Sequence, residues 1–210
     1  MVRSLWTAAT GMNAQQTNVD TISNNLANVN SVGHKAQGAQ FKSLLYQTLQ
    51  SPATTANGEP KPTSSQVGLG VRTSSINGFF SQGSMLANDS ETAFGIEGKG
   101  FFAYHDANGA IRYTRNGDLT WALGKNDGSQ LVLTTSAGNP ILDVNGKEIR
   151  VDGNRIASRL KVGGDGVITY PDEKGVTQSL GITVGLWQFE NPGGLERIGS
   201  TSFAVTQASG

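Results

Sequence analysis

The sequence contains no cysteine and only two histidines, so two common sources of site chemistry are scarce. Without cysteine the chain can form neither a disulfide framework nor a thiolate ligand or nucleophile. Lysine plus arginine (16) balance aspartate plus glutamate (16), and no global field favours a phosphate backbone or an anionic lipid surface. The composition therefore argues against nucleic acid as a partner and against cysteine-based chemistry.

Long apolar runs are missing as well. The N-terminus carries a charge at Arg3, but Gly11, Asn13 and Gln15 interrupt any continuous apolar region behind it. No run approaches the roughly 20 apolar residues that a helix needs to cross a bilayer. We expect neither a cleaved Sec-type signal nor a membrane span, so a protein of this kind needs another route if it is exported.

Charge is sparse and glycine is common. Charged residues make up 15% of the 210-residue chain, and there are 28 glycines. The length suits one compact domain with an appendage. A polar but weakly charged surface is typical of a subunit whose faces mostly meet other subunits.

The N-terminal segment, residues 1–32, predicts one long amphipathic helix. Apolar or small residues recur in it at alternating steps of three and four, the heptad spacing of a coiled-coil seam. This helix seam consists of Leu5, Ala8, Met12, Val19, Ile22, Leu26 and Val29, with Gln15 as its one interruption. The segment 28–33 should end the helix, because Asn and Gly tolerate the left-handed cap conformation.

The predicted helix has no visible partner in the sequence. Before Val29 its only charged residues are Arg3 and Asp20, and uncharged amides and hydroxyls cover the rest of its surface. A solvated single helix usually carries charge pairs at i and i+4, and an isolated helix of this length is only marginally stable. No second long helix is predicted, so we expect another subunit, or a continuation of the chain, to cover the seam.

The remainder of the chain predicts an all-β domain over residues 76–210, reached through a connector over residues 33–75. Within the connector, residues 41–49 are a short apolar stretch, and residues 51–65 are rich in Pro, Thr and Ser, which predicts an extended or mobile loop. Strands are expected at 70–76, 94–96, 100–104, 111–114, 119–123, 130–134, 141–144, 148–151, 159–162, 167–170, 178–189 and 202–206.

Six turn dipeptides separate these strands, each preferred where a tight hairpin requires positive φ. They are Asn108-Gly109, Asn116-Gly117, Asp127-Gly128, Asn145-Gly146, Asp152-Gly153 and Asp165-Gly166. Such dense turn signals favour a mainly β fold behind the long N-terminal α-helix.

Residue types that could carry chemistry have simpler interpretations here. His34 and His105 lie in different segments without metal-ligand spacing, so we expect polar loop residues and no metal. Residues 143–148 resemble a calcium loop, but the glutamate comes too early, and a hairpin turn is favoured. The glycine-rich segment 95–100 precedes a predicted strand instead of the helix that a phosphate loop requires.

Paired aspartates are the remaining catalytic possibility. Asp106, Asp118, Asp127 and Asp165 lie in or beside turn sequences, where Asp commonly bonds its own backbone. A hydrolase with two such carboxylates would lose turnover after a single Asp→Asn change. Nothing in the spacing favours it, so we expect no catalytic residue, no cofactor and no small-molecule substrate.

Several segments resemble the flagellar rod and hook protein family. Residues 4–12 and 24–30 are similar to the N-terminal signature of that family. Further similar segments follow in order at 41–48, 68–72, 98–102, 113–117, 165–167 and 189–195, and the similarity extends to Ser209-Gly210. The resemblance covers essentially the whole chain, and its opening residues are most similar to the members that build the distal rod.

The resemblance implies a structural subunit of the distal rod, with proximal rod or hook subunits as alternatives. It implies an inner tube of paired N- and C-terminal helices, an outer rod/hook-type β domain, and a 51–65 extension that reaches neighbouring subunits. Implied partners are further copies of the chain in a helical homopolymer, other rod proteins, the hook protein and the P- and L-ring proteins. The implied location is the periplasm-spanning rod of the basal body, reached through a type III export apparatus.

Two departures from the family pattern stand out. Family members continue past the Ser-Gly with a C-terminal helix, which this sequence lacks, so we expect either a truncated chain or an incomplete inner tube. His34 follows the connector glycine where the family usually has an aromatic residue. Outside the family, the residues also allow a soluble β-sheet binding module whose N-terminal helix serves only for oligomerisation.

Overall fold

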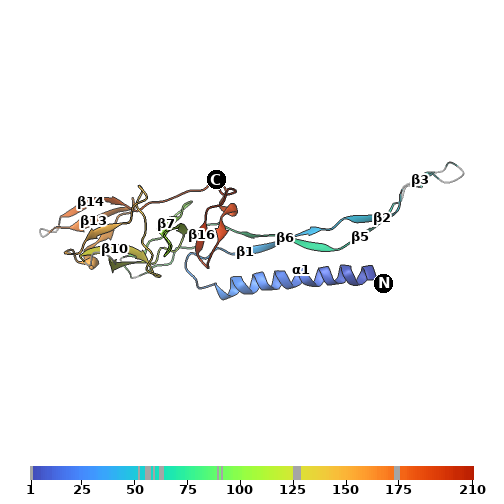
Figure 1. The fold of residues 1–210 in the computed structure, drawn as a ribbon, viewed down its shortest axis with the longest axis horizontal. Coiled ribbons are helices and arrows are strands. Elements are labelled where there is room, and N and C mark those ends of the chain that lie inside the picture. The colour runs from blue at the N-terminus through green and yellow to red at the C-terminus, as the bar shows by residue number, and fades with distance from the viewer. Residues whose placement is uncertain are drawn as a thin grey trace. The chain divides into compact units, whose positions relative to one another are not determined.

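The computed structural model describes residues 2–51, 53–54, 58, 60–61, 64–88, 90, 92–124, 129–172 and 176–210. The chain divides into two compact units (Figure 1). Unit 1 comprises residues 1–27 and 36–79, and unit 2 comprises residues 28–35 and 80–210. In the described part of the chain one long N-terminal α-helix precedes strands and two short 3-10 turns, which confirms the mainly β fold class.

Unit 1 begins with the helix α1 (Val2–Ala27). The helix ends at Ala27, and turns begin at Asn28 within the segment 28–33 that was predicted to end it, so α1 stops short of residue 32, the bound given for the N-terminal part. The amide of Ser31 donates to the carbonyl of Asn28 (3.0 Å), and the amide of His34 donates to the carbonyl of Ser31 (3.1 Å). Gly33 follows with φ +77°, the left-handed conformation expected of a glycine beyond a helix end.

The rest of unit 1 is a long antiparallel ribbon. Its strands are β1 (Gln37–Ser43), β2 (Tyr46–Gln50), β3 (Ala53–Thr54), β4 (Pro60–Lys61), β5 (Ser65–Gly68) and β6 (Val71–Gly78). β1 pairs with β6, β2 with β5 and β3 with β4, so the three described pairs are nested one within another. Of the predicted 51–65 loop, residues 52, 55–57, 59 and 62–63 lie outside the described residues.

Unit 2 contains three antiparallel sheets. One has the order β15-β16-β8-β7, from β15 (Glu196–Arg197), β16 (Ser202–Ala204), β8 (Ile111–Thr114) and β7 (Phe102–His105). The second is β11-β10-β9, from β11 (Arg150–Asp152), β10 (Gln130–Thr135) and β9 (Leu119–Leu123). The third is β12-β13-β14, from β12 (Lys161–Val162), β13 (Val167–Pro171) and β14 (Thr177–Thr183). Short 3-10 turns lie at Ala157–Arg159 and Pro192–Gly194.

Two of the strand predictions in unit 2 match the structure at both ends. β8 and β9 have the expected limits at both ends. The expected strand at 94–96 does not form, and residues 141–143 make only isolated bridges, such as Tyr104 to Ile141.

The core of unit 2 has an aliphatic and an aromatic part. The aliphatic cluster joins the sheets through buried residues that include Leu119, Leu133, Ile141, Ile149 and Ile168. The aromatic cluster consists of Phe80, Phe101, Tyr113, Phe189 and Phe203 with Leu195. Phe101 lies at its centre, with edge-to-face contacts of 5.6 to 5.8 Å between ring centroids.

The turn glycines serve two different purposes. Gly109, Gly146 and Gly166 have φ of +76°, +75° and +77°, as the hairpin signals predict. Gly117 and Gly153 do not have positive φ. A Cβ on Gly117 would lie 1.5 Å from the carbonyl oxygen of Phe94, so close backbone approach excludes any side chain there. The predicted turn at 127–128 lies outside the described residues.

The compact units do not follow the expected three-part division of the chain. Residues 36–75, expected within the connector, belong together with residues 76–79 to the same unit as the helix, and residues 28–35 belong to the β unit. Among the residues that the structure describes, no helix has both the length and the apolar character needed to cross a membrane.

Candidate assembly interface

The helix seam is exposed along the whole length of α1. Its large side chains are between 55% (Val19) and 71% (Leu26) exposed, and Ala8 is exposed too. The exposed set on the helix is Leu5, Ala8, Met12, Val19, Ile22 and Leu26. Val29, the last predicted seam residue, lies beyond the end of α1 and is 70% exposed. The structure therefore places all seven predicted residues at the surface.

A different face of the helix packs against the ribbon, along β1 and β6. Ala14 and Thr21, one heptad apart, are its two buried residues. The Thr21 hydroxyl donates to the carbonyl of Thr17 (2.7 Å), which satisfies it within the helix. A Cβ on Gly70 would lie 2.3 Å from the Thr10 hydroxyl oxygen, so the ribbon backbone approaches the helix closely there. The covered face is small and polar, whereas the seam is large and apolar.

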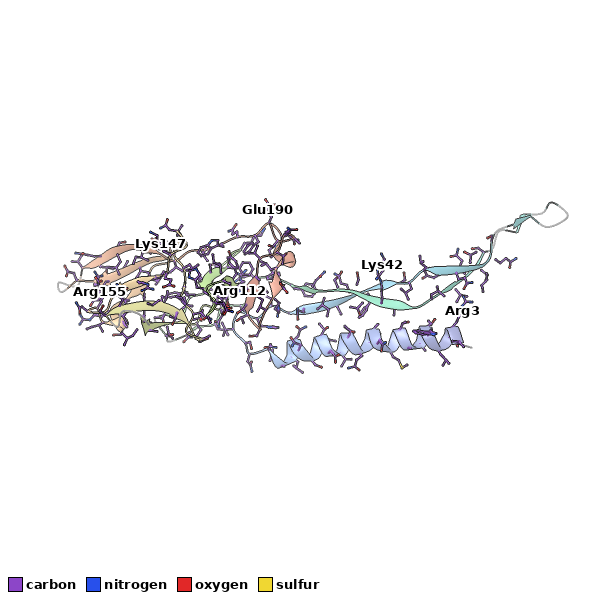
Figure 2. All side chains as sticks on the ribbon, viewed as in Figure 1. Arg3, Lys42, Arg112, Lys147, Arg155 and Glu190 are labelled. Atoms are coloured by element: carbon purple, nitrogen blue, oxygen red, sulfur yellow. The ribbon has the colours of Figure 1, made fainter. Side chains whose placement is uncertain are left out.

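Hydrogen bonds fix the helix to the ribbon near both of its ends. The side-chain amide of Asn25 donates to the carbonyl of Gln37 (2.7 Å) and accepts from the amide of Gln37 (2.9 Å). Arg3, labelled near the N-terminal end of α1 in Figure 2, donates to the side chain of Gln47. Sequence reasoning missed both contacts, and only the neighbouring asparagines at 24 and 25 hinted at a role other than helix formation.

The exposed face of α1 is nearly free of charge. Asp20 accepts a hydrogen bond from the Gln16 amide (2.8 Å) and is the only carboxylate on the helix. Trp6 is 67% exposed beside the seam. Large apolar side chains flanked by amides and a tryptophan have the composition of a protein interface.

The outer part of the ribbon carries a second set of exposed apolar side chains. Leu45 is 83% exposed, and Tyr46 and Leu49 are also exposed on β2 or beside it. The Tyr46 ring covers Gly68 on the paired strand β5. Only two strands pair in this part of unit 1, so the ribbon provides no covering layer of its own.

The two histidines occupy unrelated surroundings in unit 2. His34 Nδ1 lies 3.2 Å from the carbonyl oxygen of Ser200, and His105 Nδ1 lies 3.5 Å from Glu148 Oε1. The pKa of Glu148 is lowered, chiefly by the hydrogen bond from Arg150 and against an opposing effect of burial. Within the described ranges, no three His, Cys, Asp or Glu side chains gather as metal ligands would.

The candidate aspartates that the structure describes accept hydrogen bonds mostly from backbone amides of their own turns. Asp106 Oδ1 accepts from the amide of Ala107 (2.8 Å), and Asp165 Oδ1 accepts from the amide of Val167 (3.3 Å). In the segment that resembles a calcium loop, Asp143 Oδ1 likewise accepts from the amides of Asn145 and Lys147, both at 2.8 Å. Asp118 lines a polar hollow of about 80 Å³ and is the only acid in that lining. Asp127 lies outside the described residues. Inversion or retention by paired carboxylates needs a second acid, which the hollow lacks.

The glycine-rich segment 95–100 is a structural loop. Arg115 donates to the carbonyl of Gly98 (2.7 Å) and lies 3.4 Å from that of Ile96. Phe101 and the strand β7 follow it, so no helix N-terminus is available to hold an anion at this loop.

Comparison with known proteins identifies the family. Residues 5–35 match the model for "Flagella basal body rod protein", and residues 95–170 match that for "Flagellar hook protein FlgE/F/G D1 domain". Proteins named flagellar basal-body rod protein FlgG are 39% identical in Buchnera aphidicola subsp. Schizaphis graminum, 37% in Borreliella burgdorferi and 32% in Bacillus subtilis. Each match covers 100% of this chain and 76% of the relative. The chain therefore belongs to the flagellar basal-body rod protein family, whose members are structural subunits of the flagellum.

Proposed function

We propose that this protein is a subunit of the distal rod, and that it polymerises helically into the shaft that transmits motor torque to the hook. The observation that carries the proposal is the exposed helix seam, from Leu5 to Leu26, on a helix whose small polar face is already covered. Full burial of each large apolar side chain contributes about 1.5 to 3 kcal/mol. A seam with five of them on α1 supplies strong association once a neighbouring subunit covers it.

The proposed contacts are heterologous, with different surfaces of successive copies meeting. Contacts of this kind do not close on themselves and so generate open helical polymers. The three parts expected from the sequence then describe roles in the polymer. Residues 1–32 form the inner tube, residues 33–75 are a connector whose 51–65 extension reaches neighbouring subunits, and residues 76–210 form the outer β domain.

The uncovered ribbon supports a role in contacts between subunits. Leu45, Tyr46 and Leu49 stand exposed on a two-stranded element, which has no second layer to bury them. A neighbouring subunit that packed on the ribbon would bury this apolar area and hold the ribbon straight. The same contacts would stiffen a rod, because a ribbon fixed at both ends cannot bend freely.

Partners follow from this role. The proposed partners are further copies of the chain, other rod proteins, the hook protein and the P- and L-ring proteins around the shaft. The proposed location is the periplasm-spanning rod, with delivery by the type III export apparatus. The role requires neither catalysis nor a cofactor, nor a nucleic-acid or small-molecule ligand.

Immunogold electron microscopy of isolated hook–basal bodies tests the proposal. An antibody raised against unit 2 is used, with a deletion strain as the control. Label confined to the shaft at the level of the rings is the expected result. Label along the curved segment would instead make the protein a hook subunit, and label at the membrane end of the shaft a proximal rod subunit. Absence of label would favour a soluble binding module and reject the rod assignment.

A further inference from the structure

Residues 28–35, here called the strap, leave unit 1 after the helix and return to it at Ala36. The chain passes between the two units three times, after residues 27, 35 and 79. A single crossing by a free linker would let the two units rotate relative to each other, because rotation about φ and ψ in a flexible linker costs little free energy. Three crossings restrain rotation only when the strap itself is held at both its base and its tip.

Hydrogen bonds in unit 1 hold the base of the strap. Asn25, just before the chain departs, pairs with both backbone groups of Gln37, just after it returns (2.7 and 2.9 Å). The amide of Phe79 donates to the carbonyl of Ala36 (2.8 Å), next to the third crossing. The departing and returning ends are therefore fixed to the same ribbon.

The tip of the strap is fastened inside unit 2. Gly33 approaches the β8 end so closely that a Cβ would lie 2.7 Å from the amide nitrogen of Asn116. The Lys35 ammonium donates to the carbonyl of Ser81 (2.7 Å). Burial, and then the neighbouring Arg115 charge, lower the pKa of Lys35, which reflects how closely this cation is packed.

Arg197 makes the principal contacts with the strap. Its Nη2 donates to the carbonyl of Lys35 (2.5 Å), and its Nη1 lies 3.4 Å from His34 Nδ1. The guanidinium lies over the Phe203 ring, 5.4 Å from the centroid, and β15 pairs with β16 at these two residues. Arg197 thus joins the strap to the aromatic cluster of unit 2.

A half-buried guanidinium needs a compensating contact. Burial lowers the pKa of Arg197, because removal of the charge from water is unfavourable. The planar fork offers several donors in fixed directions, which suits it to hold a bent backbone segment. Here two guanidinium nitrogens of Arg197 contact the consecutive strap residues His34 and Lys35, so loss of Arg197 would remove both contacts at once.

We propose that Arg197 is the positioning residue that fastens the strap to unit 2, and that the fastened strap carries load between the units. The second part rests on the proposed function of the protein as a torque-transmitting rod. His34 is part of the same fastening, because its Nδ1 lies beside the Arg197 guanidinium. With Arg197 removed, the strap loses these side-chain contacts with unit 2, and its tip is then held mainly through Lys35 and Gly33.

Hydrogen exchange on the full 210-residue chain tests the fastening. Arg197→Met keeps an unbranched stem over Phe203 but removes every donor. We expect amide exchange in the peptide spanning the strap to rise about tenfold, while exchange in the core strand β10 stays unchanged. Arg159→Ala, at an exposed arginine of unit 2, is the matched control. His34→Ala tests the same fastening from the strap side should Arg197→Met fold poorly, and it should raise strap exchange as well.

Unchanged strap exchange in both Arg197→Met and His34→Ala would overturn the fastening. Load is tested by expression of each variant in a deletion strain and measurement of swimming speed as viscosity rises. The expected result is normal rods and a steeper loss of speed for Arg197→Met than for Arg159→Ala. Equal loss in the two variants would overturn the load-carrying role. Failure of the proposed function looks different, since the deletion strain itself would then retain rods and swim.

Discussion

The two units differ in where their apolar side chains lie. Unit 2 buries an aliphatic and an aromatic cluster, whereas in the described part of unit 1 only Ala14 and Thr21 are buried. The large apolar side chains of unit 1 are exposed on the helix and on the ribbon. Unit 2 therefore has the means to fold alone, and unit 1 depends on contacts from outside.

The difference decides what a mutation should change. Most helical stability in proteins comes from packing of an apolar face, and on α1 the apolar face is exposed to solvent. A change on the seam should therefore reduce assembly and leave unit 2 intact. A change in the core of unit 2 should reduce stability whether or not the protein assembles. Four predictions follow, from the largest effect to the smallest.

Leu26→Asp should abolish assembly. A carboxylate in an apolar interface costs several kcal/mol, so association should fall at least about a hundredfold. Incorporation into rods and sedimentation of the purified protein measure the effect, and near-ultraviolet circular dichroism should show an unchanged unit 2. Asn13→Asp, which adds the same charge on the helix outside the seam, is the control. Normal rods and normal motility in Leu26→Asp would show that assembly does not depend on the helix seam.

Leu133→Ala should destabilise unit 2 by about 2 to 5 kcal/mol, because a fully buried leucine leaves a cavity between the sheets. Urea denaturation followed by tryptophan fluorescence at Trp121 and Trp187 measures it. Leu45→Ala on the ribbon makes the same chemical change at an exposed site and should alter stability by less than about 0.5 kcal/mol. Equal effects at the two positions would contradict the contrast between the units.

Asn25→Ala should weaken the contact of helix and ribbon by about 1 to 2 kcal/mol, because two hydrogen bonds to Gln37 are lost. Hydrogen exchange at Gln37 should rise, with no change in the unfolding of unit 2. Asn25→Asp should be the more harmful variant, since its carboxylate would face the carbonyl of Gln37 without a donor between them. If Asn25→Asp kept the helix–ribbon contact as strongly as the native Asn25, the pairing of Asn25 with Gln37 would not be a determinant of how the helix packs on the ribbon.

Acid should slightly destabilise unit 2 through Glu148. Its pKa lies below the ordinary value of 4.5, mainly because of the Arg150 hydrogen bond. The stabilisation is therefore present above pH 4.5 and is lost as the pH falls through the lower pKa of the folded state. The pair is partly exposed, so the loss should not exceed about 1 kcal/mol. Urea midpoints between about pH 6 and pH 3 should show a shallower slope in Glu148→Gln.

Prediction from the sequence succeeded where a local pattern controls the structure. The limits of β8 and β9 were predicted from their apolar runs, although Asn116-Gly117 between them connects two different sheets and Gly117 lacks positive φ. Gly109 and Gly146 do have the positive φ predicted for tight turns. Of the ribbon, only β6 was predicted, as a strand at 70–76. Strands β1, β2 and β5 were missed because most of their side chains are exposed. A two-stranded element without a buried face has no alternation of apolar and polar residues to reveal it.

The fastening of the strap could not be read from the sequence either. His34 and Arg197 are far apart in the chain, and neither belongs to a motif that pairs them. The sequence marked His34 only as an unusual residue after the connector glycine. Its neighbours Ser200 and Arg197 are set by the pairing of β15 with β16, which depends on the aromatic cluster.

The sequence by itself determined the helix, its heptad seam and the antiparallel turns, since these depend on residue spacing and on backbone preferences over a few residues. The tertiary structure decided which helix face is covered. The ribbon packs on Ala14 and Thr21 because small side chains let two backbones approach closely, and Gly70 completes that approach. The larger seam, from Leu5 to Leu26, stays open because so narrow a ribbon covers only one face of the helix.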